Sequence, residues 1–497
     1  MEESLTLQTT KNAGWNFATN LVTKFGGLIF TIILARMLMP EMFGVYNLVL
    51  SIVIIALIFT DAGINNTSIR YLSEKIGKNN LIQARSIFRY LLKIKLILIV
   101  VTVLILSLIS KFLAVNIFLK PVILIPLLAS LVYIATLSFT NFFKSIFVSL
   151  KKLKIYFILE VTFEVLKILF VILVFYFLEN EFAVAGIFIG MSFAFLVVFI
   201  LEFFLLGKNR NILFGKTENI ENKRISKYIL SMTITSVSLV FFGAIDTLML
   251  GRFVSSEYIG YYRVALSFVF AITPLLSFSN VFLPVFTQLH GKIEIAFKKA
   301  SRYIFILAIP SALGIIVIAR YFILAIYGKE YLLATLPLYA LAFLILIHPL
   351  TDLYSVIFQS AEKANYLSKY VTISLVLNII LNYILIKYLL KFPQEYIVVG
   401  VAIATCLSRF FYLMILGIKS KKLFKTQISW IGFSKAMFSG IIMVLFLVMF
   451  QFYIDMNIYL GILEILLSAG IYFGIMFLIK GVGREDFDLI KRVIKSY

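Results

Sequence analysis

Apolar segments long enough to cross a lipid bilayer recur along the whole of this sequence. Hydrophobic residues make up 62% of the chain, its mean hydropathy is +1.03, and only 14% of its residues are Asp, Glu, Lys or Arg. A water-soluble globule does not have this composition. Hydrocarbon offers the backbone no hydrogen-bond partner, so such a chain must fold as helices or as a closed barrel, and the alternating pattern of a barrel is absent. The sequence therefore predicts an all-α polytopic membrane protein.

Charged or turn-rich breaks divide the apolar runs into about fourteen predicted transmembrane helices. Their expected ranges are 16–39, 43–65, 88–110, 121–143, 155–178, 183–206, 228–250, 258–286, 303–327, 335–360, 368–390, 396–418, 431–453 and 458–480. An even number of spans puts both ends of the chain on the same side of the membrane.

Two segments that begin 216 positions apart share one unusual pattern. Residues 25–51 read FGGLIFTIILARMLMPEMFGVYNLVLS, and residues 241–267 read FFGAIDTLMLGRFVSSEYIGYYRVALS. The ungapped alignment matches Gly27 with Gly243, Arg36 with Arg252, Glu41 with Glu257, Gly44 with Gly260 and Tyr46 with Tyr262. Chance similarity between apolar helices seldom matches such residues in one register, so the chain is an internal duplication. We expect a structural role for the matched Arg and Glu residues, with Gly44 and Gly260 allowing close helix entry.

The duplication predicts four parts. They are an N-lobe of spans 1–6 (residues 1–206), a flexible cytoplasmic basic linker (207–227), a C-lobe of spans 7–12 (228–418), and spans 13–14 with a cytoplasmic tail (419–497). The offset of 216 residues holds six spans, so the two six-helix lobes form a parallel repeat.

Lys and Arg concentrate in alternate loops, as in the loop that contains Lys144, Lys151, Lys152 and Lys154. Such an excess marks the cytoplasmic side, which predicts a multi-pass cell-membrane protein with both termini in the cytoplasm. The net charge of +22 therefore indicates contact with anionic headgroups, and no nucleic acid partner is expected.

The residues of covalent and metal chemistry are scarce. Cys406 is the single cysteine and lies inside a predicted span, and the chain has only two histidines. Phosphate-loop and zinc-protease patterns are absent, and no arrangement resembles a hydrolase triad. We expect no enzymatic activity, no metal site and no cofactor beyond a coupling ion, Na⁺ or H⁺.

Span 1 carries a polar stripe that a lipid-facing helix would not have. Asn16, Asn20, Lys24, Gly27 and Thr31 follow one another at spacings of three and four, which puts them on one face. A charge in hydrocarbon costs roughly 3 kcal/mol or more. Two interpretations remain open: Lys24 faces a wet cavity or an acidic partner, or it snorkels to the cytoplasmic interface.

Arg263 occupies the repeat position of Asn47, and a serine follows each by four residues. If span 1 faces a central cavity, the repeat brings Lys24, Asn20, Asn47 and Arg263 to its wall. A cationic lining of this kind suits an anionic substrate, particularly a phosphate or pyrophosphate. The alternative is a structural pair between Arg263 and Glu257.

Acidic residues within spans are candidates for ion coupling. Glu164 shares a face of span 5 with Glu160 and Lys167, which indicates either a stabilising ion pair or a proton or cation path. Asp246 in span 7, with Asn378 and Asn382 one turn apart in span 11, offers oxygen ligands for sodium. The alternative for Asp246 is a buried, hydrogen-bonded aspartate.

Five strings spread over the chain carry a family resemblance. They are LARMLMPEMFGVYNL after span 1, TDAGINNTSIRYLSE after span 2, DTLMLGRFVSSEYIGYYRVA around spans 7 and 8, LPVF at the end of span 8, and IYGKEY after span 9. With the duplication and fourteen spans, they resemble the multidrug/oligosaccharidyl-lipid/polysaccharide exporter superfamily, and within it the polysaccharide-type flippases.

The resemblance implies a V-shaped transporter with a central cavity and alternating access. The implied cargo is an undecaprenyl-pyrophosphate-linked oligosaccharide repeat unit, moved from the cytoplasmic to the outer leaflet for surface polysaccharide assembly. Cationic cavity residues in such flippases meet the pyrophosphate, which fits Lys24 and Arg263 by position. Glycosyltransferases and the polysaccharide polymerase of the same pathway are the implied partners.

Two other functions compete with this one. A multidrug-type, cation-coupled antiporter of small molecules should have an acidic and aromatic cavity. A glycosyltransferase or polymerase should have long extramembrane loops with a carboxylate-rich motif, and none is seen.

Overall fold

The computed structural model describes residues 2–218, 222–276, 293–361, 363, 365–454 and 458–483. Every regular element in these ranges is a helix, which confirms the predicted all-α class. Ten of the described helices are long and apolar enough to cross a membrane, or eleven if a pair bent by 45° between residues 341 and 344 is counted as one span. The chain is therefore a multi-pass membrane protein.

Each of the fourteen predicted spans falls on a helix or helix pair, although the number of membrane crossings and their division into lobes stay predictions. The end of the eighth predicted span, residues 277–286 with the LPVF string, lies outside the described residues, as do residues 484–497 of the predicted tail.

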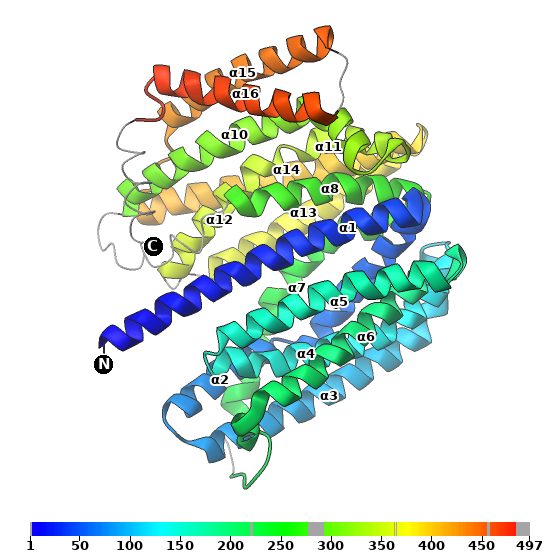
Figure 1. The fold of residues 1–497 in the computed structure, drawn as a ribbon, viewed down its shortest axis with the longest axis vertical. Coiled ribbons are helices and arrows are strands. Elements are labelled where there is room, and N and C mark those ends of the chain that lie inside the picture. The colour runs from blue at the N-terminus through cyan, green and yellow to red at the C-terminus, as the bar shows by residue number, and fades with distance from the viewer. Residues whose placement is uncertain are drawn as a thin grey trace. The chain divides into compact units, whose positions relative to one another are not determined.

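The chain divides into two compact units, residues 1–260 and 261–497. The first contains α1 (Glu2–Asp61), α2 (Ile64–Gly77), α3 (Leu81–Phe112), η1 (Leu113–Ile117), η2 (Pro121–Ile123), α4 (Leu124–Ser149), α5 (Leu153–Phe177), α6 (Asn180–Leu206), η3 (Gly207–Ile212) and α7 (Asn222–Phe253). α1 packs on α5 and α7, and α6 packs on both α4 and α5 (Figure 1).

The second unit follows the start of α8 (Ser256–Leu276). Its other elements are α10 (Ile293–Ile326), η4 (Lys329–Ala334), α11 (Thr335–Leu341), α12 (Leu344–Ser360), α13 (Asn365–Leu389), α14 (Gln394–Phe424), α15 (Trp430–Tyr453) and α16 (Ile458–Leu478). α13 packs along α14, and α15 packs on α10. The last two helices, α15 and α16, pack on each other (Figure 1).

The first two predicted spans form one helix with a break. Met39 has φ 58° and ψ 168°, which is not helical, and Pro40 follows it. The proline ring disfavours helical geometry at the preceding residue but fits the first turn of a new helix. The break therefore lies where span 1 was predicted to end.

The two copies of the repeat meet at their shared glycines. A Cβ on Gly44 would overlap the carbonyl oxygen of Ser256, and a Cβ on Gly260 would overlap the carbonyl oxygen of Pro40. Pro40 and Ser256 are themselves 216 positions apart, so the contact is symmetric under the repeat. The predicted close approach at Gly44 and Gly260 is confirmed, and backbone touches backbone there.

Arg252, one of the matched arginines, has the expected structural role. Its guanidinium donates to the carbonyl oxygens of Asn116 (3.1 Å) and Ile117 (2.8 Å), and Lys120 donates to the carbonyl oxygen of Val254 (2.7 Å). These bonds hold the end of α7 against the α3–α4 connection.

Residues 207–218 of the predicted flexible linker are held in place by hydrogen bonds. The Arg85 guanidinium on α3 donates to the carbonyl oxygens of Asn211 and Lys216, both at 2.8 Å, and Arg89 donates to that of Gly215 at 3.0 Å. We call these two arginines the α3 clasp. Because charged donors make the stronger hydrogen bonds, residues 207–218 follow a defined path along α3.

We expect Gly44→Ala to lower the free energy of unfolding by roughly 1–3 kcal/mol, because the added methyl group would force two backbones apart. The measurement is the thermal unfolding midpoint of the purified protein in detergent. Gly27→Ala is the matched control, since nothing lies within 4 Å of its added Cβ. Equal midpoints for the two variants would contradict the backbone contact.

Candidate functional site

The polar stripe of span 1 lies on the surface of α1. Asn16, Asn20 and Lys24 are exposed, while Gly27 and Thr31 are half-buried. The Thr31 hydroxyl donates to the carbonyl oxygen of Gly27 at 2.8 Å and so is satisfied within its own helix. Packing does not cover Lys24, so its ammonium is available to a ligand or to the membrane interface, and both interpretations stay predictions.

Asn47 and Arg263, which the repeat relates, have different surroundings. Asn47 is buried, and its amide nitrogen donates to the carbonyl oxygen of Phe43 at 2.8 Å. Arg263 is half-buried in the second unit, one helical turn before Ser267, whose hydroxyl lies 2.9 Å from that of Tyr327. The joint cavity lining by Lys24, Asn20, Asn47 and Arg263 stays a prediction.

Two buried ion pairs lie in the helix group α4–α5–α6. Glu164 and Lys167 of α5 form the predicted pair, with Oε2 and Nζ 2.6 Å apart. Glu160 of α5 pairs instead with Lys144 of α4, at 2.9 Å. The sequence thus placed Glu160, Glu164 and Lys167 correctly on one helix, but it did not show that Glu160 has a partner on another.

α1 and aromatic rings enclose the Glu164–Lys167 pair. A Cβ on Gly26 of α1 would overlap Oε2 of Glu164, so this glycine lets α1 lie directly on the carboxylate. The Lys167 ammonium lies 4.6 Å from the centre of the Phe30 ring and 5.3 Å from that of Phe163. Such contacts supplement the ion pair where water is excluded. Whether Glu164 stabilises the bundle or takes part in ion coupling stays an open prediction.

Lys144 was wrongly assigned to a cytoplasmic loop. It lies inside α4, which continues to Ser149, and it is only 3% exposed. The helix can extend over this lysine because Glu160 neutralises the ammonium and the rings of Phe163 and Phe195 lie 5.7 and 5.5 Å from it. The available signal was Glu160, an acid in an apolar span that requires a base nearby.

Sequence reasoning missed two further charges inside spans. Lys95 of α3 is fully buried and pairs with Asp61, the last residue of α1, at 3.1 Å. Glu202 of α6 is also fully buried. A lysine in the predicted span 88–110 and a glutamate in the span 183–206 were the signals.

The candidate residues for sodium coupling lie in different units. Asp246 is buried in α7 of the first unit. In the second unit, the Asn378 amide donates to the Ser408 hydroxyl (3.2 Å), and the Asn382 amide donates to Oδ1 of Asn378 (3.3 Å). This buried ladder joins α13 to α14, and a joint role with Asp246 stays a prediction. No group of three or more His, Cys, Asp or Glu side chains placed to hold a metal ion occurs among the residues the structure describes.

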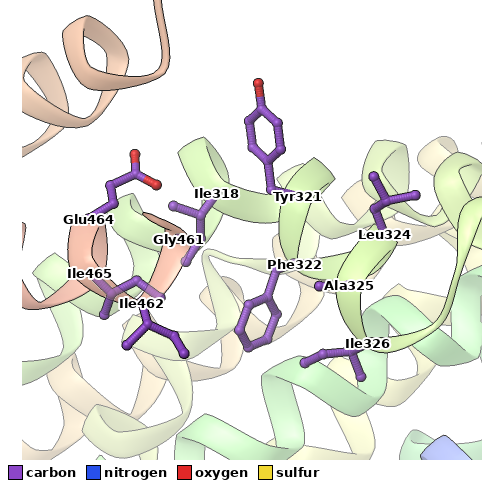
Figure 2. Close-up of a pocket in the computed structure, with 10 residues that line it drawn as sticks. All are labelled: Ile318, Tyr321, Phe322, Leu324, Ala325, Ile326, Gly461, Ile462, Glu464 and Ile465. Atoms are coloured by element: carbon purple, nitrogen blue, oxygen red, sulfur yellow. The ribbon is translucent and has the colours of Figure 1, made fainter. Parts of the chain in front are cut away.

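The second unit has an apolar groove between α10 and α16, with a cavity of about 380 Å³ (Figure 2). Its lining residues are Ile318, Tyr321, Phe322, Leu324, Ala325 and Ile326 from α10, and Gly461, Ile462, Glu464 and Ile465 from α16. The Glu464 carboxylate accepts a hydrogen bond of 2.9 Å from Gln451 of α15 and is almost fully buried. Apart from the Tyr321 hydroxyl and the Glu464 carboxylate, the lining side chains are hydrocarbon, so the groove accommodates an apolar chain.

A family model described as "Polysaccharide biosynthesis protein" matches residues 9–290, more than half of the chain. The chain belongs to this family. A search of curated protein sequences found no match. The resemblance to polysaccharide-type exporters expected from the sequence is therefore confirmed.

Solved structures of transporters share the fold. A lipid II flippase MurJ in an inward closed conformation matches with a TM-score of 0.76 at 17% identity, over 94% of this chain and 98% of that one. An inward-facing multidrug resistance MATE family transporter of the MOP superfamily matches with a TM-score of 0.65 at 15% identity, over 82% and 96%. A MOP superfamily transporter from Pyrococcus furiosus Vc1, described as having a binding pocket of reverse polarity, matches with a TM-score of 0.57 at 16% identity, over 82% and 94%. The chain thus has the fold of these transporters, as predicted.

We expect Lys167→Met to lower the free energy of unfolding by roughly 3–5 kcal/mol, because Glu164 would keep a buried charge without its partner. The double variant Glu164→Gln/Lys167→Met should recover most of that loss, as measured by thermal unfolding in detergent.

The exposed pair Lys78–Glu74, whose lysine side chain is 67% exposed, is the matched control. Lys78→Met should change stability by about 1 kcal/mol or less. A Lys167→Met loss as small as this would contradict the buried ion pair.

Proposed function

We propose that this protein is a flippase for an undecaprenyl-pyrophosphate-linked oligosaccharide repeat unit. It moves the unit from the cytoplasmic to the outer leaflet of the cell membrane by alternating access, for surface polysaccharide assembly. The family assignment supports a role in polysaccharide biosynthesis. The transporter fold supports the transport of a cargo and does not favour a chemical reaction on it.

The observation that carries this proposal is the exposed Lys24 in the polar stripe of α1. The amides of Asn16 and Asn20 lie on the same stripe and supply further hydrogen-bond donors. An ammonium and amides in one row suit a pyrophosphate and the hydroxyl groups of sugars. Arg263, the repeat counterpart of Asn47, would add a second cationic position.

The cargo has two parts with opposite needs. Its sugar and pyrophosphate headgroup is too polar for hydrocarbon, and its polyprenyl tail is too apolar for water. The polar stripe suits the headgroup, and the apolar groove between α10 and α16 suits a hydrocarbon chain. A protein that offers both surfaces fits a lipid-linked cargo.

A multidrug-type, cation-coupled antiporter of small molecules is the second candidate, because a multidrug transporter shares the fold over 82% of this chain. Its substrates are cations, which an exposed lysine in the cavity would repel. Glu164, Asp246, Asn378 and Asn382 remain the candidate residues for coupling to Na⁺ or H⁺ under either function.

Lys24→Ala should cause lipid-linked repeat units to accumulate in the cytoplasmic leaflet and should reduce surface glycan at least tenfold, since the loss of one charged hydrogen bond to a pyrophosphate is worth about 1.5–3 kcal/mol. Arg263→Ala should reproduce much of this defect. The measurement is surface glycan together with extracted lipid-linked intermediates in cells that carry each variant as their only copy.

Lys93→Ala is the matched control, because it removes the same charge from an exposed position of α3. Lys24→Arg should retain activity. Normal surface glycan in both Lys24→Ala and Arg263→Ala would refute the cationic site, and resistance to cationic dyes on overexpression would favour the antiporter.

A further inference from the structure

Glu202 is a buried acid without a visible means of neutralisation. Its side chain is 0% exposed, and neither carboxylate oxygen has a hydrogen-bond partner in the described part of the chain. It lies four residues before the end of α6, where α6 packs between α4 and α5. An ionised carboxylate without a partner in such a place would cost several kcal/mol.

The charges that act on Glu202 come from the two neighbouring helices. They are the ammonium of Lys144 on α4 and the carboxylate of Glu160 on α5. Lys144 is already committed to Glu160, with 2.9 Å between Nζ and Oε1. On the η3 side, Arg210 is engaged elsewhere, since its guanidinium donates to the carbonyl oxygen of Phe203 and lies 4.5 Å from the centre of the Phe203 ring.

The charges of Lys144, Glu160 and Glu202 do not cancel one another. These three side chains are one base and two acids, so they are neutral together only if they also hold one positive ion. Lys144 and Glu202 are buried, and the Glu160 side chain is 13% exposed. The nearby Glu164–Lys167 pair is neutral by itself and supplies none. Phe163 and Phe195, which flank Lys144 and stack on each other at 4.0 Å, contribute no oxygen ligand.

The positive charge that would neutralise these three side chains has the chemistry of a proton. A metal cation such as Na⁺ or Ca²⁺ takes several oxygen ligands, and here an ammonium lies beside the two carboxylates and would repel it. A proton needs only one carboxylate oxygen, and it removes the buried charge outright.

We propose that Glu202 is a proton-binding site of the first unit, which shares one exchangeable proton with Glu160 across the Lys144 ammonium. In the observed arrangement Lys144 neutralises the Glu160 carboxylate and the proton is bound to a Glu202 oxygen. When the ammonium turns toward Glu202, that O–H bond breaks, Glu202 becomes the carboxylate paired with Lys144, and Glu160 takes up one proton. The total charge is the same in both states. Tyr156, whose hydroxyl interacts electrostatically with the Glu160 carboxylate, is the other titratable group at this end of the cluster.

The test is infrared spectroscopy of the purified full-length protein at neutral pH, read as differences between wild type and variants. The C=O stretching band of a protonated carboxylic acid should be lost in Glu202→Gln. It should also be lost in Glu160→Gln, because Lys144 then pairs with Glu202 and ionises it, although Glu202 is still present. Lys144→Met should roughly double the band, since both acids then need a proton. Thermal unfolding of each variant establishes that it is folded.

Glu181→Gln is the matched control, because Glu181 is an exposed glutamate at the start of the same helix and should leave the band unchanged. An unchanged band in Glu202→Gln, or a band retained in Glu160→Gln, would overturn the proposal. The measurement needs no cargo, so its result does not depend on whether the proposed flippase function is correct.

A role of the Glu202 proton in driving transport would depend on the proposed flippase function. It is read separately, from surface glycan in cells carrying Glu202→Gln at normal protein level. Lost glycan supports coupling, and normal glycan overturns the coupling role while leaving the proton site intact.

Discussion

Neutralisation of charge inside an apolar bundle is the constraint on which the first unit depends. Lys95 with Asp61 links α3 to the end of α1, and Lys144 with Glu160 links α4 to α5. Removing one member of such a pair lowers the free energy of unfolding far more than replacing both members by apolar residues, because the remaining charge stays where water cannot reach it. The pairs therefore restrict which helices can be neighbours and in which register they pack. Glu202 departs from this pattern, which is why it points to function and not to packing.

Backbone contact at glycine is the second determinant of the fold. Gly44 and Gly260 bring the start of each repeated helix against the turn of the other copy, and Gly26 admits the Glu164 carboxylate to the surface of α1. In hydrocarbon, helices gain little by hiding apolar side chains from lipid that is equally apolar, so close van der Waals contact matters more. Small residues are accordingly found at these closest helix contacts, while large aliphatic residues occur both in the core and on the exposed faces.

Much of this could be predicted from the sequence, because helices in a membrane satisfy their own backbone. The long apolar runs, the break at Met39–Pro40, the repeat and the glycine contact all depend on residues close together in the chain or matched by the duplication. Partners on other helices could not be predicted in this way. Lys144 looked like a loop lysine because its neutralising acid is sixteen residues away on another helix. Glu202 could be recognised in the sequence as a charge within a predicted span, but only the packing of α4, α5 and α6 shows that it is fully buried without a partner for its carboxylate.

The α3 clasp has a consequence for how the segment after α6 tolerates change. Arg85 and Arg89 bind the carbonyl oxygens of Asn211, Gly215 and Lys216, and every amino acid carries a carbonyl oxygen. The route of this segment is consequently specified by the two arginines and hardly at all by the side chains along it. Gly215 is the exception, because its φ is 121° and a Cβ there would overlap the Arg85 guanidinium. At the other positions evolution or an engineer can exchange the side chains, adding or removing positive charge, while the main chain keeps its course.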